Sequence, residues 1–340
     1  MRRITILLIF FTWFVSAASP QEQWKHKNTI FNAPGTVALM TSARATDSIP
    51  AAAPACRNRY FFQTIDVPFG QPGIDLDMQA LYRSDSGIVA VQYQIPPSGT
   101  CCGAPGFTEN DHTAVLRSGT WTNIDVPGAV STLASNPDEQ GNVALSYKFA
   151  DGVWHVAIRN KRGLTTFPEP PGYPGGIQAS GINNRGEVAA LLLDAAGHAH
   201  GYVGDGKRYS VLDYPGATDT YFTKVADTGV VVGYYGLADG SLHAFWYNDG
   251  HFRKIDPPGA AASGVAVALS INNAGDIAGA YFNANGWLVG FLLEKGRFVD
   301  FRVQDAPLTV PWSINNRGEI AGIYAGADGI YHGFVAKPNP

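Results

Sequence analysis

The chain has 340 residues, a net charge of −4 and a hydrophobic content of 45%, with only 15% charged residues. This composition is too apolar for a disordered protein, and its slight acidity offers no basic field for nucleic acid or anionic lipid. The 39 glycines and 22 prolines, with 15 tyrosines and 18 phenylalanines, favour many short strands separated by turns.

Residues 1–18 have the pattern of a secretory signal peptide. Arg2 and Arg3 form a positive start, an apolar run covers 4–15, and small residues stand at 16–18. The run is shorter than the roughly 20 apolar residues that a membrane-spanning helix needs. We therefore expect cleavage and a secreted or periplasmic protein without a membrane span, with an uncleaved anchor as the alternative.

A second segment, residues 19–58, is small, polar and interrupted by proline, as in "TSARATDSIPAAAPAC". Such a composition is typical of a weakly ordered lead-in. The remaining residues, 59–337, are expected to form one domain. Of the three cysteines, Cys56 is expected not to be bridged to Cys101 or Cys102, because they belong to opposite ends of the expected strands.

The domain consists of a repeat that is most visible in "SINNAGDIAGAYF" and "SINNRGEIAGIYA", which begin 43 residues apart. Each copy has a glycine turn followed by an apolar strand. The turn glycines are Gly87, Gly141, Gly186, Gly229, Gly275 and Gly318, with spacings of 54, 45, 43, 46 and 43. Six copies of one unit predict a repeat architecture.

Two further markers recur along the chain with the turn glycines. The first is a histidine, as in "HAF" or "HGF", at His112, His155, His200, His243 and His332, with Val289 in the fifth copy. The second is an aromatic strand that ends in an acid and proline, with the acids Asp66, Asp125, Glu169, Asp213, Asp256 and Asp305. The first of these strands precedes the first turn glycine, and none follows the last copy.

This offset of the aromatic strand from the other two markers predicts a closed ring, because the N-terminal strand supplies the aromatic strand that the last unit lacks. A unit of about 45 residues accommodates four short strands, and Asn and Gly suit the turns between them. The sequence therefore predicts an all-β fold: a six-bladed β-propeller of four-stranded blades, in which residues 60–69 close the last blade.

The pattern "INNxGxIAGxY" followed by "HGF" or "HAF" resembles the HAF-type extracellular repeat of exported bacterial proteins. The resemblance extends over about residues 60–336 and is most specific in the last four copies, since "SDSG" and "PDEQG" replace "INNxG" in the first two. It implies an exported repeat protein and no particular activity.

Residues that occur in every copy are best explained by folding. We interpret the histidines as structural side chains held by backbone groups, since their slot lies away from the axis. The repeated acids are interpreted as corner caps that bond to nearby backbone. Residues that break the repeat are the better candidates for function.

Most irregular features belong to one face, where the longer connections gather. The first copy has an insertion at 91–111. Asp75 and Asp77 are placed beside it, and Glu109 and Asp111 lie at its end. Four carboxylates could bind a hard cation such as calcium, and an ordinary solvated acidic rim is the alternative. In or beside loops of the same face stand Tyr173, Tyr221 and Trp287, which are either ligand-stacking residues or packing residues between blades.

The sequence has no GxSxG, HExxH, GxGxxG or Walker-type motif. The leading hypothesis is a secreted binding module that recognises a glycan, a peptide or another surface partner on the loop-rich face. An extracytoplasmic hydrolase or lyase at the same face is the alternative, and a structural envelope protein is a second one. The absence of an acid–base motif favours a protein without catalytic activity or cofactor.

Overall fold

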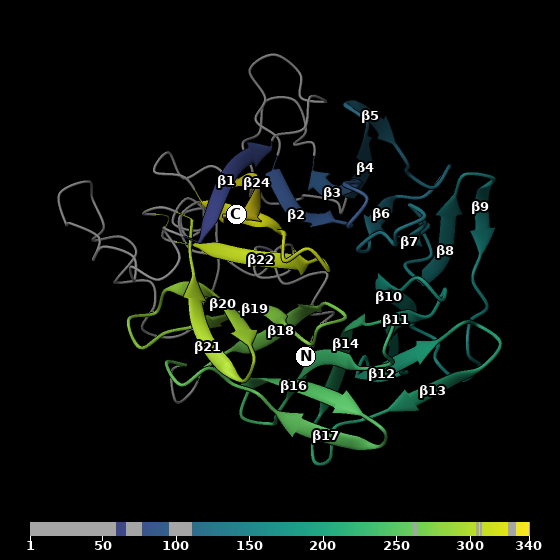
Figure 1. Cartoon of the computed structure of the whole chain (residues 1–340). Helices are drawn as coiled ribbons and strands as arrows, with labels where there is room; N and C mark the ends of the chain where they lie inside the picture. Colours follow the sequence, from purple (N-terminus) through teal and green to yellow (C-terminus); the bar gives the residue numbers. More distant parts are fainter. Residues whose placement is uncertain are drawn as a thin grey trace, which may run out of the picture.

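The computed structural model describes residues 59–65, 77–94, 111–260, 264–303, 306, 308–325 and 331–339. Within these residues every regular element is a β-strand, and the strands form six blades around one axis (Figure 1). The six-bladed β-propeller that the repeat predicts is confirmed. No helix in this part of the chain is long and apolar enough to cross a membrane. The leader, the lead-in and the three cysteines lie outside the described residues.

The first three blades follow one another along the chain. Blade 1 contains β2 (Asp77–Arg83), β3 (Val89–Gln94), β4 (Asp111–Arg117) and β5 (Thr120–Asn123). Blade 2 contains β6 (Ser131–Ala134), β7 (Val143–Lys148), β8 (Trp154–Asn160) and β9 (Gly163–Thr166). Blade 3 contains β10 (Gly176–Ile182), β11 (Val188–Leu193), β12 (Ala199–Gly204) and β13 (Tyr209–Leu212).

The other three blades complete the circle. Blade 4 contains β14 (Asp219–Val225), β15 (Val231–Gly236), β16 (Leu242–Asn248) and β17 (His251–Lys254). Blade 5 contains β18 (Ala266–Ile271), β19 (Ile277–Phe282), β20 (Leu288–Glu294) and β21 (Arg297–Phe301). Blade 6 contains β22 (Thr309–Ile314), β23 (Ile320–Ala325), β24 (Tyr331–Pro338) and, from the other end of the domain, β1 (Tyr60–Ile65).

Each blade is an antiparallel sheet whose first strand lies innermost. A parallel pairing of Trp154 with Gly176 joins blades 2 and 3 into one eight-stranded sheet, and a parallel bridge between Asn136 and Gly181 also links them. The second strands β11, β15 and β19 are buried along their whole length, whereas the outer strands β5 and β17 are largely exposed. Apolar residues therefore fill the space between neighbouring blades, and polar residues cover the rim.

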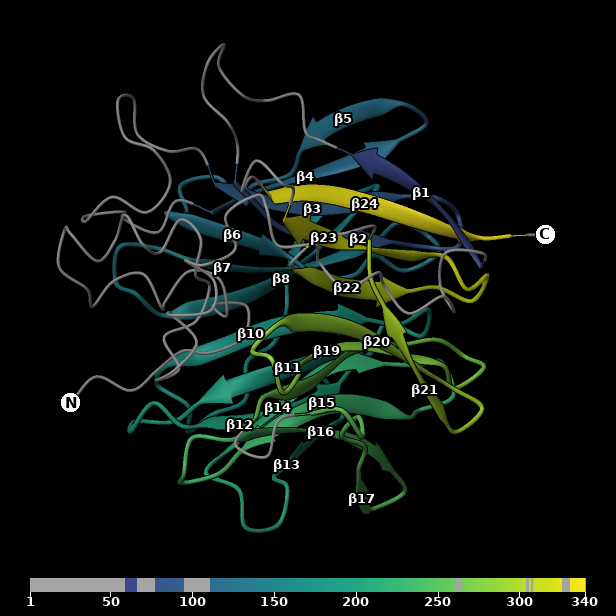
Figure 2. The ribbon, with the colours of Figure 1, turned by 90° about the vertical axis from the view of Figure 1, so that its left-hand side faces the viewer.

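The ring closes as the phase of the repeat predicts. β1 pairs with β24 in antiparallel register from Tyr60 opposite Pro338 to Ile65 opposite Gly333, and the two strands run side by side in Figure 2. Tyr60 also packs edge-on against Phe301 of blade 5, with ring centroids 5.5 Å apart. The N-terminal strand thus satisfies the open edge of β24 and buries an aromatic ring against the neighbouring blade.

Two parts of the sequence motif turn out to fit together. The glycine that ends "VVG" or "IAG" lies directly opposite the phenylalanine of "HAF", "VGF" or "HGF" in three blades, as Gly279 does opposite Phe291. A Cβ on Gly279 would come within 2.5 Å of that ring and 2.2 Å of the Val267 carbonyl oxygen. Glycine is therefore required because strand and ring leave no room for a side chain.

Candidate functional site

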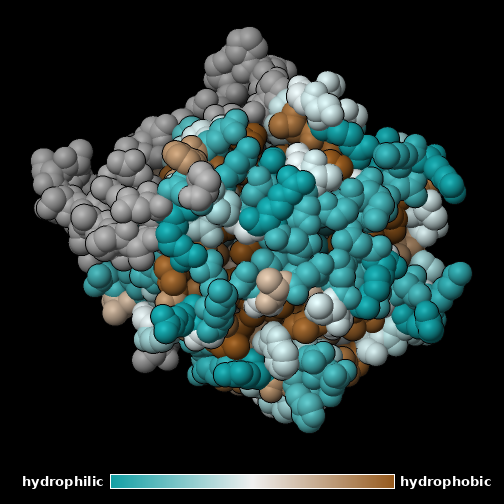
Figure 3. Space-filling view, viewed as in Figure 1, coloured by the Kyte–Doolittle hydropathy of each residue, from teal (hydrophilic) through white to brown (hydrophobic). Residues whose placement is uncertain are grey.

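The propeller has two faces that differ in the connections they carry. We call the face with the turns from first to second strands the tight-turn face; its turns include 183–187, 272–276 and 315–319. The opposite face, where second strands connect to third strands and each blade leads into the next, is the loop-rich face. The tight-turn face is turned toward the viewer in Figure 3, with hydrophilic side chains gathered over the middle of the molecule.

The first asparagine of the "INNxG" motif shapes its own turn. Asn272 Oδ1 accepts hydrogen bonds from the Ala274 and Asp276 amides at 3.0 and 2.9 Å. Asn315 accepts from Arg317 and Glu319 in the same way. Such side chain to backbone bonds replace the strand pairing that the chain loses at a turn.

The second position of the motif connects neighbouring blades. Each residue in this position donates its backbone amide to the side-chain oxygen of the equivalent residue in the next blade, at 2.6–2.9 Å. The six members of this ring, which we call the belt, are Asp85, Glu139, Asn184, Asp227, Asn273 and Asn316. The belt is a closed circle of hydrogen bonds around the axis, and sequence reasoning attributed these residues to turn formation alone.

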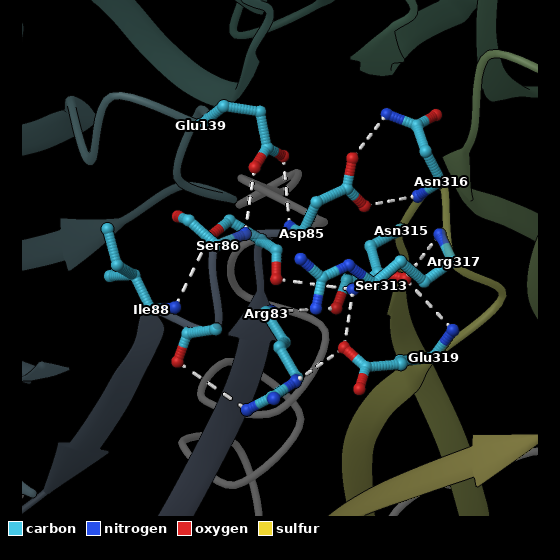
Figure 4. A network of polar contacts seen from close by, with 12 residues as sticks. Arg83, Asp85, Ser86, Ile88, Glu139, Ser313, Asn315, Asn316, Arg317 and Glu319 are labelled. Carbon is cyan, nitrogen blue, oxygen red and sulfur yellow. Dashed lines mark hydrogen bonds and ion pairs between the residues drawn. The ribbon is translucent and has the colours of Figure 1, made fainter. Parts of the chain in front are cut away.

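Figure 4 shows the belt where the last blade meets the first. Asn316 donates its backbone and side-chain amides to the two carboxylate oxygens of Asp85 at 2.6 and 2.7 Å. Glu139 in turn accepts from the amides of Asp85 and Ser86. This junction therefore carries the same bonds as the others, although its two blades come from opposite ends of the domain.

One ion pair is added at this junction alone among the belt neighbours. Arg83 Nε donates to Glu319 Oε2 at 2.9 Å, and the two side chains are 16% and 9% exposed. Glu319 also accepts from Asn315 Nδ2. Burial works against ionisation of Glu319, but the donors Arg83 and Asn315 hold its pKa below the usual value. The pair thus reinforces the junction that closes the ring.

Hydrogen bonding decides which belt carboxyls ionise easily. Although Asp227 is partly buried, the donors Asn273 and Asn184 hold its pKa below the ordinary value. Burial and the negative charge of Asp85 raise the pKa of Glu139, because its two amide donors only partly offset them. The belt is acidic in composition, yet amides occupy its carboxylate oxygens.

An axial pocket opens inside the belt. It has a volume of about 380 Å³, open solvent at the mouth included, and the turns of all six blades line it. Its most unusual member is Lys224, which is 9% exposed and donates from Nζ to the Ile182 carbonyl oxygen at 2.7 Å. Burial lowers the pKa of the Lys224 ammonium to about 8, although Asp227 and more distant carboxylates act in the opposite direction.

The loop-rich face carries a different repeated unit, a histidine–acid pair within one blade, which in blades 1, 2 and 4 has a tyrosine opposite the histidine. In blade 4, Tyr235 lies opposite His243, and His243 Nδ1 bonds to Asp256 Oδ2 at 2.6 Å. Asp256 also accepts from the Ala244 amide. The equivalent histidine–acid pairs are His112–Asp125, His155–Glu169 and His200–Asp213.

These pairs correct two interpretations drawn from the sequence. The described partners of His112, His155, His200 and His243 are acids and not backbone groups, and these acids do more than cap corners, because the two markers bind each other. In blade 1, the hydrogen bond to Asp125 raises the pKa of His112. Asp66 and Asp305 lie outside the described residues.

Blade 5 lacks this unit. Val289 replaces the histidine, and Arg302 stands 13 residues later, the spacing of the pairs in blades 1, 3 and 4. Arg302 lies over the ring of Trp287, with Cζ 5.2 Å from the centroid, and donates to the Ala306 carbonyl oxygen. A cation over an aromatic ring thus takes the place of the acid–base pair.

The three aromatic candidates do not share one environment. Tyr221 is 2% exposed and stacks on Tyr234 with ring centroids 4.5 Å apart, so it packs in the core. Tyr173 is partly buried and meets His200 edge-on, with centroids 5.6 Å apart. Trp287 is partly buried beside Arg302. Tyr173 and Trp287 belong to different blades, and ligand contact by either stays a prediction.

Of the four carboxylates predicted to bind calcium, only Asp111 has a described side chain. It is 6% exposed at the start of β4 and accepts from Ser131 Oγ at 2.7 Å. Asp75 and Glu109 lie outside the described residues, as does the side chain of Asp77. Within the described residues no group of three or more His, Cys, Asp or Glu side chains could hold a metal ion. The calcium site therefore remains a prediction.

Blade 2 exposes apolar residues on the loop-rich face that sequence reasoning did not single out. Phe149 and Val130 are 38% and 41% exposed. The Phe149 ring centroid lies 6.3 Å from that of His155, whose Nδ1 bonds to Glu169 Oε1 at 2.7 Å. We call Val130, Phe149, His155 and Glu169 the blade 2 patch. The repeat could have revealed Phe149, because Asp194, Leu237 and Asn283 stand at the same distance from their turn glycines.

Comparison with known proteins gives no family for the chain. No family model matches, and no curated protein matches. Among solved structures, virginiamycin B lyase from Staphylococcus aureus is 13% identical, with 81% of this chain and 88% of that chain covered and a TM-score of 0.44.

Two further solved structures are similar at the same level. The six-bladed propeller lectin of Aleuria aurantia, described with a fucose recognition mode, is 10% identical over 80% of this chain and 96% of that chain, with a TM-score of 0.47. TolB from Acinetobacter baumannii is 12% identical over 78% and 79%, with a TM-score of 0.49. Likenesses of this strength say nothing about activity, so function has to be argued from this chain's own residues.

Proposed function

We propose that this chain is an exported binding module that recognises a glycan at the blade 2 patch on its loop-rich face. Export is supported by the charged, apolar and small segments of residues 1–18. The propeller supplies a rigid frame on which loops and strand ends can present side chains to a partner.

The observation that carries the proposal is an exposed aromatic ring beside an oriented polar pair. Phe149 offers an apolar surface of the kind on which the C–H face of a sugar packs. Glu169 uses Oε1 to hold His155, and its carboxylate is 37% exposed, so Oε2 is available to accept a hydroxyl proton. His155 Nε2 provides a further polar atom on the same side, since Nδ1 is already engaged with Glu169.

The surroundings keep the patch in place. Val130 follows the link from blade 1 to blade 2, and its amide donates to the Lys148 carbonyl oxygen at 2.9 Å. Tyr147 is 9% exposed and supports Phe149 edge-on, with ring centroids 5.5 Å apart. A binding surface built on paired backbone and packed rings loses little entropy when a ligand arrives.

A binding role fits this face better than catalysis. The histidine–acid pairs of the repeated unit join the third strand of a blade to the residues after its fourth strand, as His243–Asp256 does between β16 and the residues after β17. The Nδ1 atom and one carboxylate oxygen of each pair thereby form a structural bond. The hydrolase or lyase and the structural envelope protein remain alternatives that the following experiment separates.

The test is a glycan array on the purified protein, followed by calorimetry with the best glycan. Phe149→Ala should weaken binding about tenfold, which corresponds to about 1.4 kcal/mol. Phe61→Ala is the matched control, because Phe61 is a 66% exposed ring on the outer strand β1. That control should bind like the unaltered protein.

The alternatives give different results. Cleavage of the bound glycan, seen as new reducing or unsaturated ends, would favour the hydrolase or lyase. Binding of peptides but of no glycan would contradict the choice of ligand. Full glycan binding by Phe149→Ala would show that the patch is wrongly placed.

A further inference from the structure

The axial pocket holds one side chain that breaks the repeat. Five residues before the turn glycine, blade 4 has Lys224. The same slot in the other blades contains Tyr82, Asn136, Gly181, Ser270 and Ser313. A long cationic side chain is therefore not a requirement of the fold at this place, and it calls for a separate explanation.

The neighbouring blade leaves room for this lysine. A Cβ on Gly181 would lie 2.8 Å from Lys224 Cδ and 3.0 Å from the Thr223 carbonyl oxygen. The lysine stem thus runs across the backbone of blade 3, and its amine reaches the Ile182 carbonyl oxygen. Gly181 and Lys224 occupy the same slot of adjacent blades and fit each other as a pair.

The amine is buried without a partner carboxylate in ion-pair contact among the described residues. The nearby acids are committed elsewhere: Asp227 to Asn184 and Asn273, Asp85 to Asn316, and Glu139 to backbone amides. A buried lysine without an ion-pair partner loses its proton more easily than an exposed lysine does. Because burial lowers the pKa of Lys224 to about 8, a minor share of the amine, roughly a tenth at pH 7, is neutral.

A neutral amine in a pocket is a nucleophile, and its natural target is a carbonyl carbon. The only hydrogen bond of Lys224 Nζ in the described structure goes to the Ile182 carbonyl oxygen, which leaves the lone pair of the neutral form unengaged. The backbone carbonyl also orients the amine. The pocket lining around it is rich in amide and carboxylate groups, including Asn136, Asn183 and Asn272.

We propose that the axial pocket binds a small hydroxylated aldehyde and that Lys224 captures it reversibly as an imine. The Nζ lone pair forms a bond to the carbonyl carbon while the C=O π electrons move to oxygen, and one proton then passes from the nitrogen to that oxygen. The resulting carbinolamine then loses its hydroxyl group and a proton from nitrogen as water. The products are the imine and one water molecule, and no oxidant or reductant takes part.

The size and polarity of the pocket restrict the ligand. A volume of about 380 Å³ that includes open solvent at the mouth excludes an oligosaccharide, so the ligand can be no larger than a compound of a few carbons. Hydroxyl groups match the amide and carboxylate lining, whereas an anionic ligand would meet the acidic belt. The site lies on the tight-turn face, opposite the blade 2 patch, so this inference does not depend on the proposed glycan recognition.

The experiment traps the imine. The folded protein is incubated with glyceraldehyde and cyanoborohydride at pH 7.5, which reduces an imine to a stable secondary amine, and the modified lysines are located by peptide mass mapping. Lys224 should be modified at least tenfold faster than any other lysine. Excess glycerol, which has the hydroxyls but no carbonyl, should slow modification of Lys224 only.

Two other lysines serve as internal controls. Burial also lowers the pKa of Lys148 to about 8, but Lys148 lies over the Trp154 ring and outside the pocket. Lys254 has a 47% exposed side chain. Equal rates at Lys224 and Lys148 would show that a lowered pKa alone governs reactivity, and this would overturn the proposal. Slower modification of Lys224 than of Lys254 would overturn it as well.

A variant confirms the assignment. Lys224→Met keeps the length of the stem and removes the amine, and it should lose the fast modification while all other lysines react as before. Because the mapping is made on the unaltered protein, the result stands even if this variant folds poorly. Glyceraldehyde modification that persists at the same rate in Lys224→Met would contradict the assignment to this residue.

Discussion

The belt and the histidine–acid pairs are both repeated around the propeller, but they join different parts of it. The belt connects one blade to the next and is present at all six junctions. The histidine–acid pair connects two strands of one blade, and blade 5 replaces it with Val289 and Arg302. An interaction between blades must recur for the ring to close, whereas one within a blade can be replaced locally.

The largest expected effect comes from breaking closure itself. Deletion of residues 59–65 removes β1, exposes the edge of β24 and uncovers Phe301, against which Tyr60 packs. We expect loss of cooperative unfolding and of solubility, measured by calorimetry and size-exclusion chromatography. Phe61→Ala, which keeps the strand pairing, should melt nearly like the unaltered protein. A deletion variant with an unchanged melting transition would contradict this view of the closure.

Removal of a belt side chain should have the next largest effect on stability. Asn184→Ala removes the acceptor for the Glu139 amide and the donor to Asp227 Oδ2. Leaving such partly buried groups unpaired costs about 1–3 kcal/mol. Asn160→Ala is the control, because Asn160 bonds only to the Arg162 amide within its own hairpin turn. Urea unfolding should show a clearly larger loss for Asn184→Ala, and equal losses would mean that the belt adds nothing beyond turn formation.

The Lys224 site makes a prediction about pH. Since burial lowers the folded-state pKa to about 8, from 10.5 in the unfolded chain, the unfolded state binds more protons between these values. Stability contributed by this group must therefore rise with pH from about 8 upward, by at most about 1.4 kcal/mol per pH unit.

The measurement is the difference in unfolding free energy between the unaltered protein and Lys224→Met at pH 7, 8 and 9. The difference should shift in favour of the unaltered protein as the pH rises. A pH-independent difference would mean that the amine is fully charged in the folded protein.

The smallest effect on stability is expected when the histidine–acid pair within one blade is broken. The folded-state pKa of His112 is raised and that of Asp125 is lowered. Stability from the histidine is lost as pH rises through its folded pKa, and stability from the acid is lost as pH falls through its own. The pair therefore contributes most between about pH 4 and pH 6.5.

Because both side chains are about one quarter exposed, the contribution should stay below about 1 kcal/mol. His112→Gln should destabilise the protein more at pH 5 than at pH 8.5 in thermal unfolding. A loss that is equal at both pH values would show that the pair acts only as a neutral hydrogen bond.

The sequence predicts the propeller well because strand length, turn glycines and the displaced aromatic strand are all local patterns. It predicts the belt poorly, since each bond joins residues 43–54 positions apart, or 231 at the closing junction. One signal was available: the position two residues before every turn glycine has a side-chain oxygen acceptor. Tyr221 lies in β14, two residues after its start at Asp219, and its burial agrees with the packing alternative.

The two ends of the domain meet in blade 6, where β1 pairs with β24, and we call this place the seam. Its position bears on the order in which the blades can follow one another along the chain. The Asn339 amide donates to the Arg59 carbonyl oxygen at 2.7 Å, so the two sides of the seam meet at one edge of blade 6. All blade junctions are built from equivalent belt bonds, and none depends on which blade is synthesised first. A circular permutant that links these adjacent positions and opens the chain in the hairpin turn of another blade should therefore reach the same native ring.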